Sequence, residues 1–405
     1  MDRWINLFDR GLFVFLCLML AFATFSIAGT EICFTLALLL FLSKKTGQRI
    51  LKSEWKVFPS SALNLPVLCF LLASFLSTVF SIEPTKSLFV FIGKTLEYAL
   101  IYFLLLEVLK AKAGGRRFEI VLTVLIGFYA LSVLDGIFQH FQGVDFFRQR
   151  PLVNGYLTAA FKYYNDFGSY LILFLPLNLG LLFLKRSYFS IHFFLSLSLA
   201  MLAGLCLALT YSRGAWIGFI CAFSLFFIGG FFYLTTSTNQ KILFLLSVIA
   251  LILLVFFLSP LSMKERAISI FHLESAGRLG KEGLWYEAMR LVKNKFLLGY
   301  GLGVYMDLSK GTYAHNCYLQ MLAETGVVGI ASFLWILHRL FTGGARIFRK
   351  SKDPLLLGIL TGIIGFLIHS VFDTNLYSLQ LSVLFWAMLA LAIVRMEMVL
   401  EERRI

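Results

Sequence analysis

The sequence predicts an all-α, polytopic membrane protein with about twelve transmembrane helices and one large polar loop. Of its 405 residues, 59% are hydrophobic and only 14% are charged, and 44 are Phe. Soluble domains average about a quarter charged residues, and the hydrocarbon core of a bilayer requires about 20 apolar residues per helix. The composition therefore excludes a soluble fold, and apolar windows of that length predict where the helices run.

Twelve apolar windows follow one another along the chain. They cover residues 11–27, 29–43, 62–81, 87–107, 119–139, 166–184, 191–211, 214–234, 242–260, 318–342, 355–371 and 378–395. The first two are short, and Gly29-Thr30-Glu31 predicts a tight turn between them. We expect one integral membrane domain, residues 1–405, in which residues 262–318 form a large helical loop.

Lysine and arginine predict the orientation, because cytoplasmic loops carry the excess of these residues. They gather in four connections, which hold Lys44 to Lys56, Lys110 to Arg117, Lys185 to Arg186 and Arg346 to Lys352. The short turns between these connections contain almost no lysine or arginine. Both termini are therefore expected in the cytoplasm, and residues 262–318 on the outer side. This bias, with contacts to anionic membrane lipid, accounts for most of the net charge of +14. No basic stretch is interleaved with stacking aromatics, so nucleic acid is not an expected partner.

Arg213 lies where the seventh and eighth spans meet on the outer side, in Thr210-Tyr211-Ser212-Arg213-Gly214-Ala215-Trp216. An arginine near the bilayer centre costs about 2.5–3.5 kcal/mol, but here the side chain can reach the interface beside Trp216. The turn is too tight to need a charge, and the small Gly214 and Ala215 would let the guanidinium approach an anionic ligand. Interfacial and ligand-binding roles both stay open.

Arg278, Trp285 and Met289 are spaced to lie on one face of a helix. This spacing predicts a short amphipathic helix at the outer surface, with Arg278 beside the apolar stripe.

His315 immediately precedes Asn316, a candidate N-cap, and Gly326 predicts a break in the helix that follows. His315 would be held at a helix start close to the membrane, where a neutral imidazole can act as a base. A lone histidine in a loop is more often structural, so that alternative stays open. Further along, His369 and Asp373 are four residues apart and form either a local pair or a support for the site.

The glycine cluster Gly299-Tyr300-Gly301-Leu302-Gly303 is not a nucleotide motif, because such motifs need a preceding strand and a following helix. It predicts a tight turn that lets backbone pass near the site.

These motifs together resemble one family. Ser212 to Trp216, Arg278 with Trp285, Leu298 to Gly303, and His315-Asn316 followed by Tyr318-Leu319 and Glu324-Thr325-Gly326 occur in the order typical of O-antigen ligases. The superfamily also holds O-antigen polymerases and some oligosaccharyltransferases. The resemblance implies an enzyme of the bacterial inner membrane, with a periplasmic site, that moves a glycan from undecaprenyl diphosphate to a sugar hydroxyl of lipid A–core.

The resemblance also implies roles for individual residues. Arg213 and Arg278 would bind the diphosphate, because a guanidinium binds phosphate bidentately and stays charged. The acids of the outer face form no D-x-D pair, so neither a metal nor another cofactor is expected. His315 would be the catalytic base of a direct displacement with inversion. Supporting roles are expected for Asn316, Trp285, Glu324, Arg148 and Arg150.

Some of these supporting roles have alternatives. Glu324 could orient a helix or pair with an arginine, and Arg148 and Arg150 could meet substrate phosphates or only solvent and headgroups.

Two other functions also stay open. An O-antigen polymerase would use a carrier-linked acceptor, and a non-enzymatic lipid-glycan exporter would distribute charges through the midplane, whereas here they cluster at one face. The donor glycan, the acceptor hydroxyl and the oligomeric state are not predicted.

Overall fold

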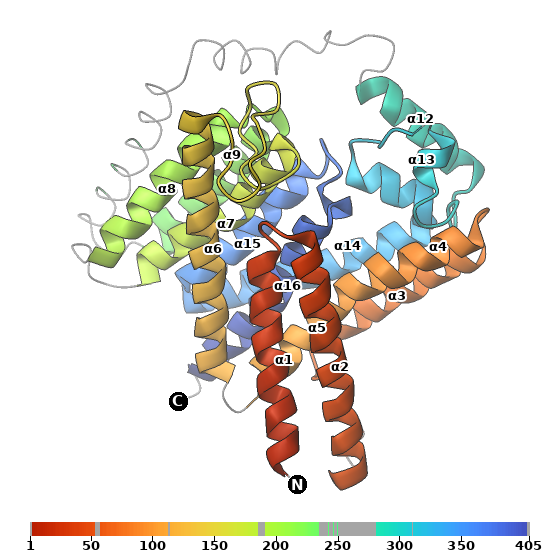
Figure 1. Ribbon diagram of the computed structural model, residues 1–405, viewed down its shortest axis with the longest axis horizontal. Coiled ribbons are helices and arrows are strands. Elements are labelled where there is room, and N and C mark those ends of the chain that lie inside the picture. Colours follow the sequence, from red (N-terminus) through yellow and green to blue (C-terminus); the bar gives the residue numbers. More distant parts are fainter. Residues whose placement is uncertain are drawn as a thin grey trace.

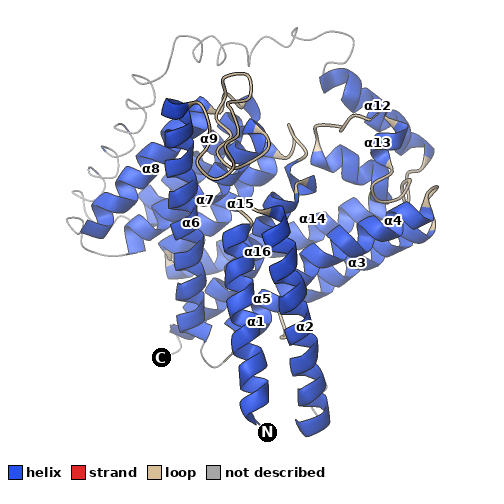
Figure 2. Ribbon diagram, viewed as in Figure 1, coloured by secondary structure: helices blue, strands red, loops and turns tan. Residues whose placement is uncertain are grey.

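The computed structural model describes residues 2–52, 57–111, 114–184, 191–234, 281–309 and 311–402, and single positions at 242, 246 and 249. Within these ranges the regular structure is helical (Figure 2), and only two isolated β-bridges occur, both between residues 144 and 156. The all-α prediction is confirmed.

The helices follow the predicted order (Figure 1). They are α1 (Asp2–Phe22), α2 (Ile27–Lys52), α3 (Asn64–Val79), α4 (Pro84–Val90), η1 (Phe91–Leu96), α5 (Glu97–Leu109), α6 (Gly114–Gln142), α7 (Tyr164–Leu184), α8 (Ile191–Leu209), α9 (Arg213–Gly229), η2 (Gly230–Leu234), α12 (Lys281–Asn294), α13 (Tyr305–Leu308), α14 (Cys317–Ser351), α15 (Pro354–His369), η3 (Asn375–Tyr377) and α16 (Leu379–Glu402).

Among the described residues, nine helical segments are long and apolar enough to cross a membrane, and α3 and α15 are shorter apolar helices. These eleven segments correspond to eleven of the twelve predicted windows. The remaining window, 242–260, lies outside the described residues apart from its single positions.

The first two spans differ from the prediction. They run over Trp4–Phe22 and Ile27–Ile50 and are therefore not short, and the turn lies at residues 23–26 rather than at Gly29 to Glu31. Ser26 starts α2, because its hydroxyl accepts a hydrogen bond from the Gly29 amide at 3.1 Å. Gly29 lies inside α2, where a Cβ would come within 2.7 Å of the Phe22 ring.

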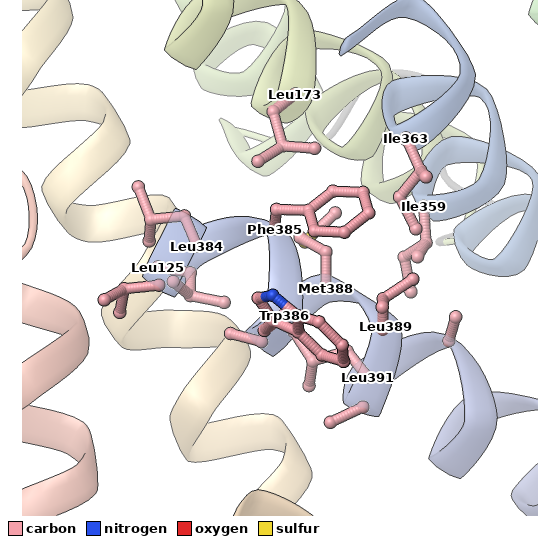
Figure 3. Close-up of a cluster of buried hydrophobic side chains, with 14 of the residues drawn as sticks. Leu125, Leu173, Ile359, Ile363, Leu384, Phe385, Trp386, Met388, Leu389 and Leu391 are labelled. Carbon is pink, nitrogen blue, oxygen red and sulfur yellow. The ribbon is translucent and has the colours of Figure 1, made fainter. Parts of the chain in front are cut away.

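The core is centred on α7 and α16, whose apolar windows are the most buried of the described spans. Figure 3 shows Phe385, Trp386 and Leu389 of α16 packed among Leu173 of α7 and Ile359 of α15. Glycines let α7 and α15 approach closely, because a Cβ at Gly358 or Gly362 would overlap backbone carbonyl oxygens of α7.

The helix α14 is too long to be one straight crossing, since 35 residues extend about 52 Å at 1.5 Å per residue. Gly326 breaks it with φ 66° and ψ −172°, which confirms the predicted break. The amides of Val327 and Val328 donate to the carbonyls of Phe296 and Leu297, at 2.8 and 3.3 Å. Loop backbone thus takes the place of the helical hydrogen bonds lost at the kink.

The glycine cluster forms a tight turn against this kink. Gly299, Gly301 and Gly303 have φ of 68°, 110° and 72°, a region that favours glycine. The amides of Tyr300 and Gly301 donate to the carbonyls of Ala323 and Glu324, at 2.9 and 3.0 Å. The cluster therefore fastens the large loop to the first part of α14.

The helix α12 is amphipathic, but its buried face is not the one predicted. Leu284, Ala288, Leu291 and Val292 are buried, whereas Met289 is 41% exposed. Ala288, Leu291 and Val292 form a small second core with Tyr305, Ala314 and Ala323, which seats the loop on α14. The buried positions Leu284 and Ala288 each precede by one residue the positions that were predicted, Trp285 and Met289.

Both termini lie at the same end of the helix bundle, and the loop of residues 143–163 lies at the opposite end (Figure 1). The membrane orientation inferred from lysine and arginine stays a prediction.

Candidate active site

His315 lies directly before the first turn of α14. Asn316 is the N-cap, as predicted, and its Oδ1 accepts hydrogen bonds from the amides of Tyr318 and Leu319 at 3.0 and 3.1 Å. His315 itself has φ 46°, a left-handed conformation that few non-glycine residues adopt. The cap and this conformation together hold the imidazole at the end of the helix.

The imidazole of His315 contacts a carboxylate from a distant part of the chain. Its Nδ1 lies 3.2 Å from Oδ1 of Asp373, and the two side chains are 42% and 12% exposed. The same Oδ1 accepts a hydrogen bond from the Thr374 amide at 2.8 Å. If Nδ1 carries the proton and donates to Asp373, Nε2 is left as the basic nitrogen.

Burial disfavours ionisation of Asp373, but hydrogen bonds from His315 and the Thr374 amide and the charge of the nearby His369 outweigh it. The pKa of Asp373 is therefore lowered from its usual value. The result is a carboxylate that stays charged while it holds the imidazole.

Hydrogen bonds tie the start of α14 to the end of α15. The Cys317 amide donates to the Ser370 carbonyl at 2.8 Å, and the Cys317 thiol lies 3.2 Å from the Asp373 carbonyl. The Tyr318 hydroxyl donates to the Leu367 carbonyl at 2.7 Å. These bonds determine where His315 lies relative to Asp373.

A buried polar network supports this junction from α7. Ser169 Oγ lies 2.7 Å from His369 Nδ1, and the Asn375 amide group donates to Ser169 Oγ at 3.4 Å. Ser370 Oγ donates to Asn375 Oδ1 at 2.7 Å. His369 thus contacts Ser169 and lies near Asp373.

Arg213 is the first residue of α9, and the preceding turn is three residues long. Ser212 is the N-cap, since its hydroxyl accepts a hydrogen bond from the Ala215 amide. The next residue, Gly214, packs on α15: a Cβ there would come within 2.9 Å of His369 and 2.8 Å of Phe372. Arg213 therefore lies beside the end of α15 that carries Asp373, at a helix N-terminus, which favours bound anions.

The loop of residues 143–163 packs over this turn. The Leu157 amide donates to the Leu209 carbonyl at 3.2 Å, and the rings of Tyr156 and Tyr211 stack at 4.9 Å.

The remaining predicted site residues lie at different places. Arg278 is outside the described residues. Trp285 is half-buried on α12, and its Nε1 finds no hydrogen-bond partner in the described part of the chain. Glu324 is 2% exposed and accepts a hydrogen bond at 3.3 Å from Gln320, one turn earlier on α14, and no arginine of the described ranges pairs with it.

Fold and site together define a class: a polytopic, all-helical membrane protein with a histidine–aspartate pair and an arginine at helix ends on one side. A family model described as O-antigen ligase matches residues 198–334, roughly a third of the chain. This matched region contains the motifs from Ser212 to Gly326, and it agrees with the family that those motifs resemble. The family implies a membrane enzyme of the glycosyltransferase kind. No curated protein matches the chain.

Proposed function

We propose that this chain is an O-antigen ligase that moves a glycan from undecaprenyl diphosphate to a sugar hydroxyl of lipid A–core, at the periplasmic face of the inner membrane. The observation that carries the proposal is the His315–Asp373 contact of 3.2 Å beside the helix end that bears Arg213. A base and an anion-binding cation close together are what glycosyl transfer from a lipid diphosphate requires.

On the donor side, Arg213 binds the diphosphate. Its guanidinium offers paired donors to phosphate oxygens, and the N-terminal end of α9 adds the unpaired amides and the dipole of a helix start. Arg278 supplies the second guanidinium. Because these groups provide the positive charge that the leaving group needs, the proposed reaction requires neither metal nor another cofactor.

On the acceptor side, Nε2 of His315 takes the proton of the sugar hydroxyl. The hydroxyl oxygen attacks the anomeric carbon from the face opposite the diphosphate, and a new glycosidic bond forms. The bond from that carbon to the phosphate oxygen breaks, and its electron pair leaves with the diphosphate. Attack from the opposite face inverts the configuration, while Asp373 stabilises the imidazolium.

The test is complementation of a ligase-deficient Gram-negative strain. The intact chain should attach glycan to lipid A–core, and His315→Ala and Arg213→Gln should abolish the attachment at matched expression. His140→Ala, at an exposed histidine near the outer end of α6, is the matched control and should transfer normally.

Other outcomes would identify a different function. Lengthened glycan on the lipid carrier, with none on lipid A–core, would indicate an O-antigen polymerase. Full transfer by His315→Ala would contradict the mechanism, and export of glycan without any transfer would contradict an enzymatic role.

A further inference from the structure

The turn Lys295 to Leu298, which joins α12 to the glycine cluster, exposes large apolar side chains outside the predicted spans. Phe296 and Leu297 are 54% and 66% exposed, although the sequence places them in the polar loop of residues 262–318. Their backbone is fixed, because their carbonyls accept the two amides that follow the kink in α14, at 2.8 and 3.3 Å. Apolar groups that a fastened backbone holds outward indicate a surface that meets an apolar partner.

The length of α14 places this turn at a membrane boundary. The part of α14 after the kink, Val327 to Ser351, is about 37 Å long, which is enough to cross a hydrocarbon core of about 30 Å once. Its far end is basic, with Arg349 and Lys350 in the last turn, and such residues mark where a helix leaves the membrane. The near end, and the turn that is hydrogen-bonded to it, therefore lie at the opposite boundary.

The turn also continues an apolar surface that runs along two packed helices. On α14, Val328 and Leu334 are exposed. On α3, exposed apolar residues recur at helical spacing and form a stripe of Leu65, Leu68, Leu72, Phe75 and Val79. The two helices pack together, with the rings of Phe70 and Phe333 5.8 Å apart. Because the Val328 amide donates to the Leu297 carbonyl, the turn extends this lipid-facing surface past the kink.

Basic residues accompany the exposed apolar pair, and acidic residues do not. Residues 288–306 include Arg290, Lys293 and Lys295 and no acid. Lys293 is exposed, and the ammonium of Lys295 lies 5.1 Å from the centre of the Tyr300 ring, so its charge stays at the turn. Lysines beside apolar side chains are typical of segments at a membrane surface, since the stem packs in the apolar region while the ammonium reaches the headgroups.

We propose that the turn Lys295 to Leu298 is a membrane anchor. It inserts Phe296 and Leu297 into the bilayer surface, while Lys293 and Lys295 bind the phosphates of anionic lipid headgroups. The partner is lipid rather than another protein, because the turn continues the lipid-facing sides of α3 and α14. The anchor sets the height of the glycine cluster, and through it of the first segment of α14. This inference does not depend on the proposed function.

The first test measures the depth of the turn. Full-length Phe296→Trp protein is reconstituted in bilayers whose acyl chains carry bromine at one of several depths, and its added fluorescence is taken as the difference from the parent protein. Bromines near the headgroups should quench this fluorescence most strongly. Leu68→Trp, in the middle of the α3 stripe, is the matched control, which deeper bromines should quench best. Quenching of Phe296→Trp by aqueous acrylamide, and by none of the brominated lipids, would overturn the anchor.

The second test measures the headgroup preference at the same position. In the Phe296→Trp protein, a small fraction of brominated phosphatidylglycerol should quench more strongly than the same fraction of brominated phosphatidylcholine. Each lysine should contribute about five-fold to the apparent affinity, so that adding Lys293→Gln or Lys295→Gln lowers the preference by that factor. Lys86→Gln is the control, because Asp307 already pairs with that lysine. Equal quenching by the two lipids would overturn the role of the lysines, as would an unchanged preference in both variants.

Discussion

At the scale of single residues, the catalytic proposal depends on Asp373 holding His315. Asp373→Asn keeps the size of the side chain but removes its charge, so the imidazolium loses its stabilising partner. We expect kcat to fall about 10²–10⁴-fold, within the range of positioned acid–base groups, with little change in KM. Steady-state transfer assays on purified protein would measure this.

The control for that substitution is Asp307→Asn, at an exposed acid that pairs with Lys86 on the surface. It should leave kcat unchanged. A normal kcat in Asp373→Asn would show that the carboxylate only packs against the site.

The lowered pKa of Asp373 gives a second prediction, for stability against pH. A carboxyl group whose folded pKa lies below its unfolded value, about 3.9, stabilises the fold above that value and loses its contribution as pH falls through the folded pKa. The stability that the parent protein has over Asp373→Asn, measured by thermal unfolding, should thus persist from pH 7 down to about pH 5. It should shrink only below about pH 4, and a difference that already disappears near pH 6 would contradict the shift.

The sequence predicted some of these residues and missed others for physical reasons. His315 and Asn316 were found because helix caps are local patterns. The partnership with Asp373 was not, since it joins residues 58 apart, which no periodicity connects. On α12 the predicted face was displaced because Met289 is exposed although it is as apolar as Leu284 and Ala288, which are buried.

At the scale of elements, the kink in α14 positions the short first segment of that helix, Cys317 to Thr325, which begins beside His315. Gly326→Ala should destabilise the fold by at least about 1–3 kcal/mol, the cost of a conformation that is nearly exclusive to glycine. The added Cβ would also overlap the Leu297 carbonyl oxygen. Thermal unfolding in detergent would measure the loss.

The control lies on the same helix. Gly343 is helical, and the nearest atom to an added Cβ is the Met396 sulfur at 4.0 Å. Gly343→Ala should therefore be neutral or stabilise the fold by up to about 1 kcal/mol. Equal effects of the two substitutions would mean that the kink is not a constraint.

Elements were the most predictable part of the fold. Apolar windows of bilayer length identified eleven spans, because hydrophobic length is what a membrane selects. They did not predict the turn at residues 23–26, since hydropathy does not register a capping hydroxyl such as that of Ser26.

At the scale of the whole molecule, a buried ion cluster joins four helices at the end that holds the termini. Lys44 of α2 pairs with Asp9 of α1 at 2.6 Å and with Glu107 of α5 at 2.7 Å, and Arg117 of α6 also pairs with Asp9. Lys44→Met would leave two carboxylates with less compensation, so we expect about 3–5 kcal/mol of destabilisation. Denaturation in detergent would test this, with exposed Lys350→Met as the control; a loss no larger than the control's would contradict it.

The pairing of His315 with Asp373 also limits how the gene can recombine. The family match ends at residue 334, yet the carboxylate lies beyond it, and the loop of residues 143–163, which packs over the turn before Arg213, lies before it. A crossover between residues 334 and 369 would join the imidazole of one strain to the α15 end of another. Natural exchange of such genes, and any designed chimera, should therefore succeed when the segment from the α6–α7 loop through η3 moves as one block.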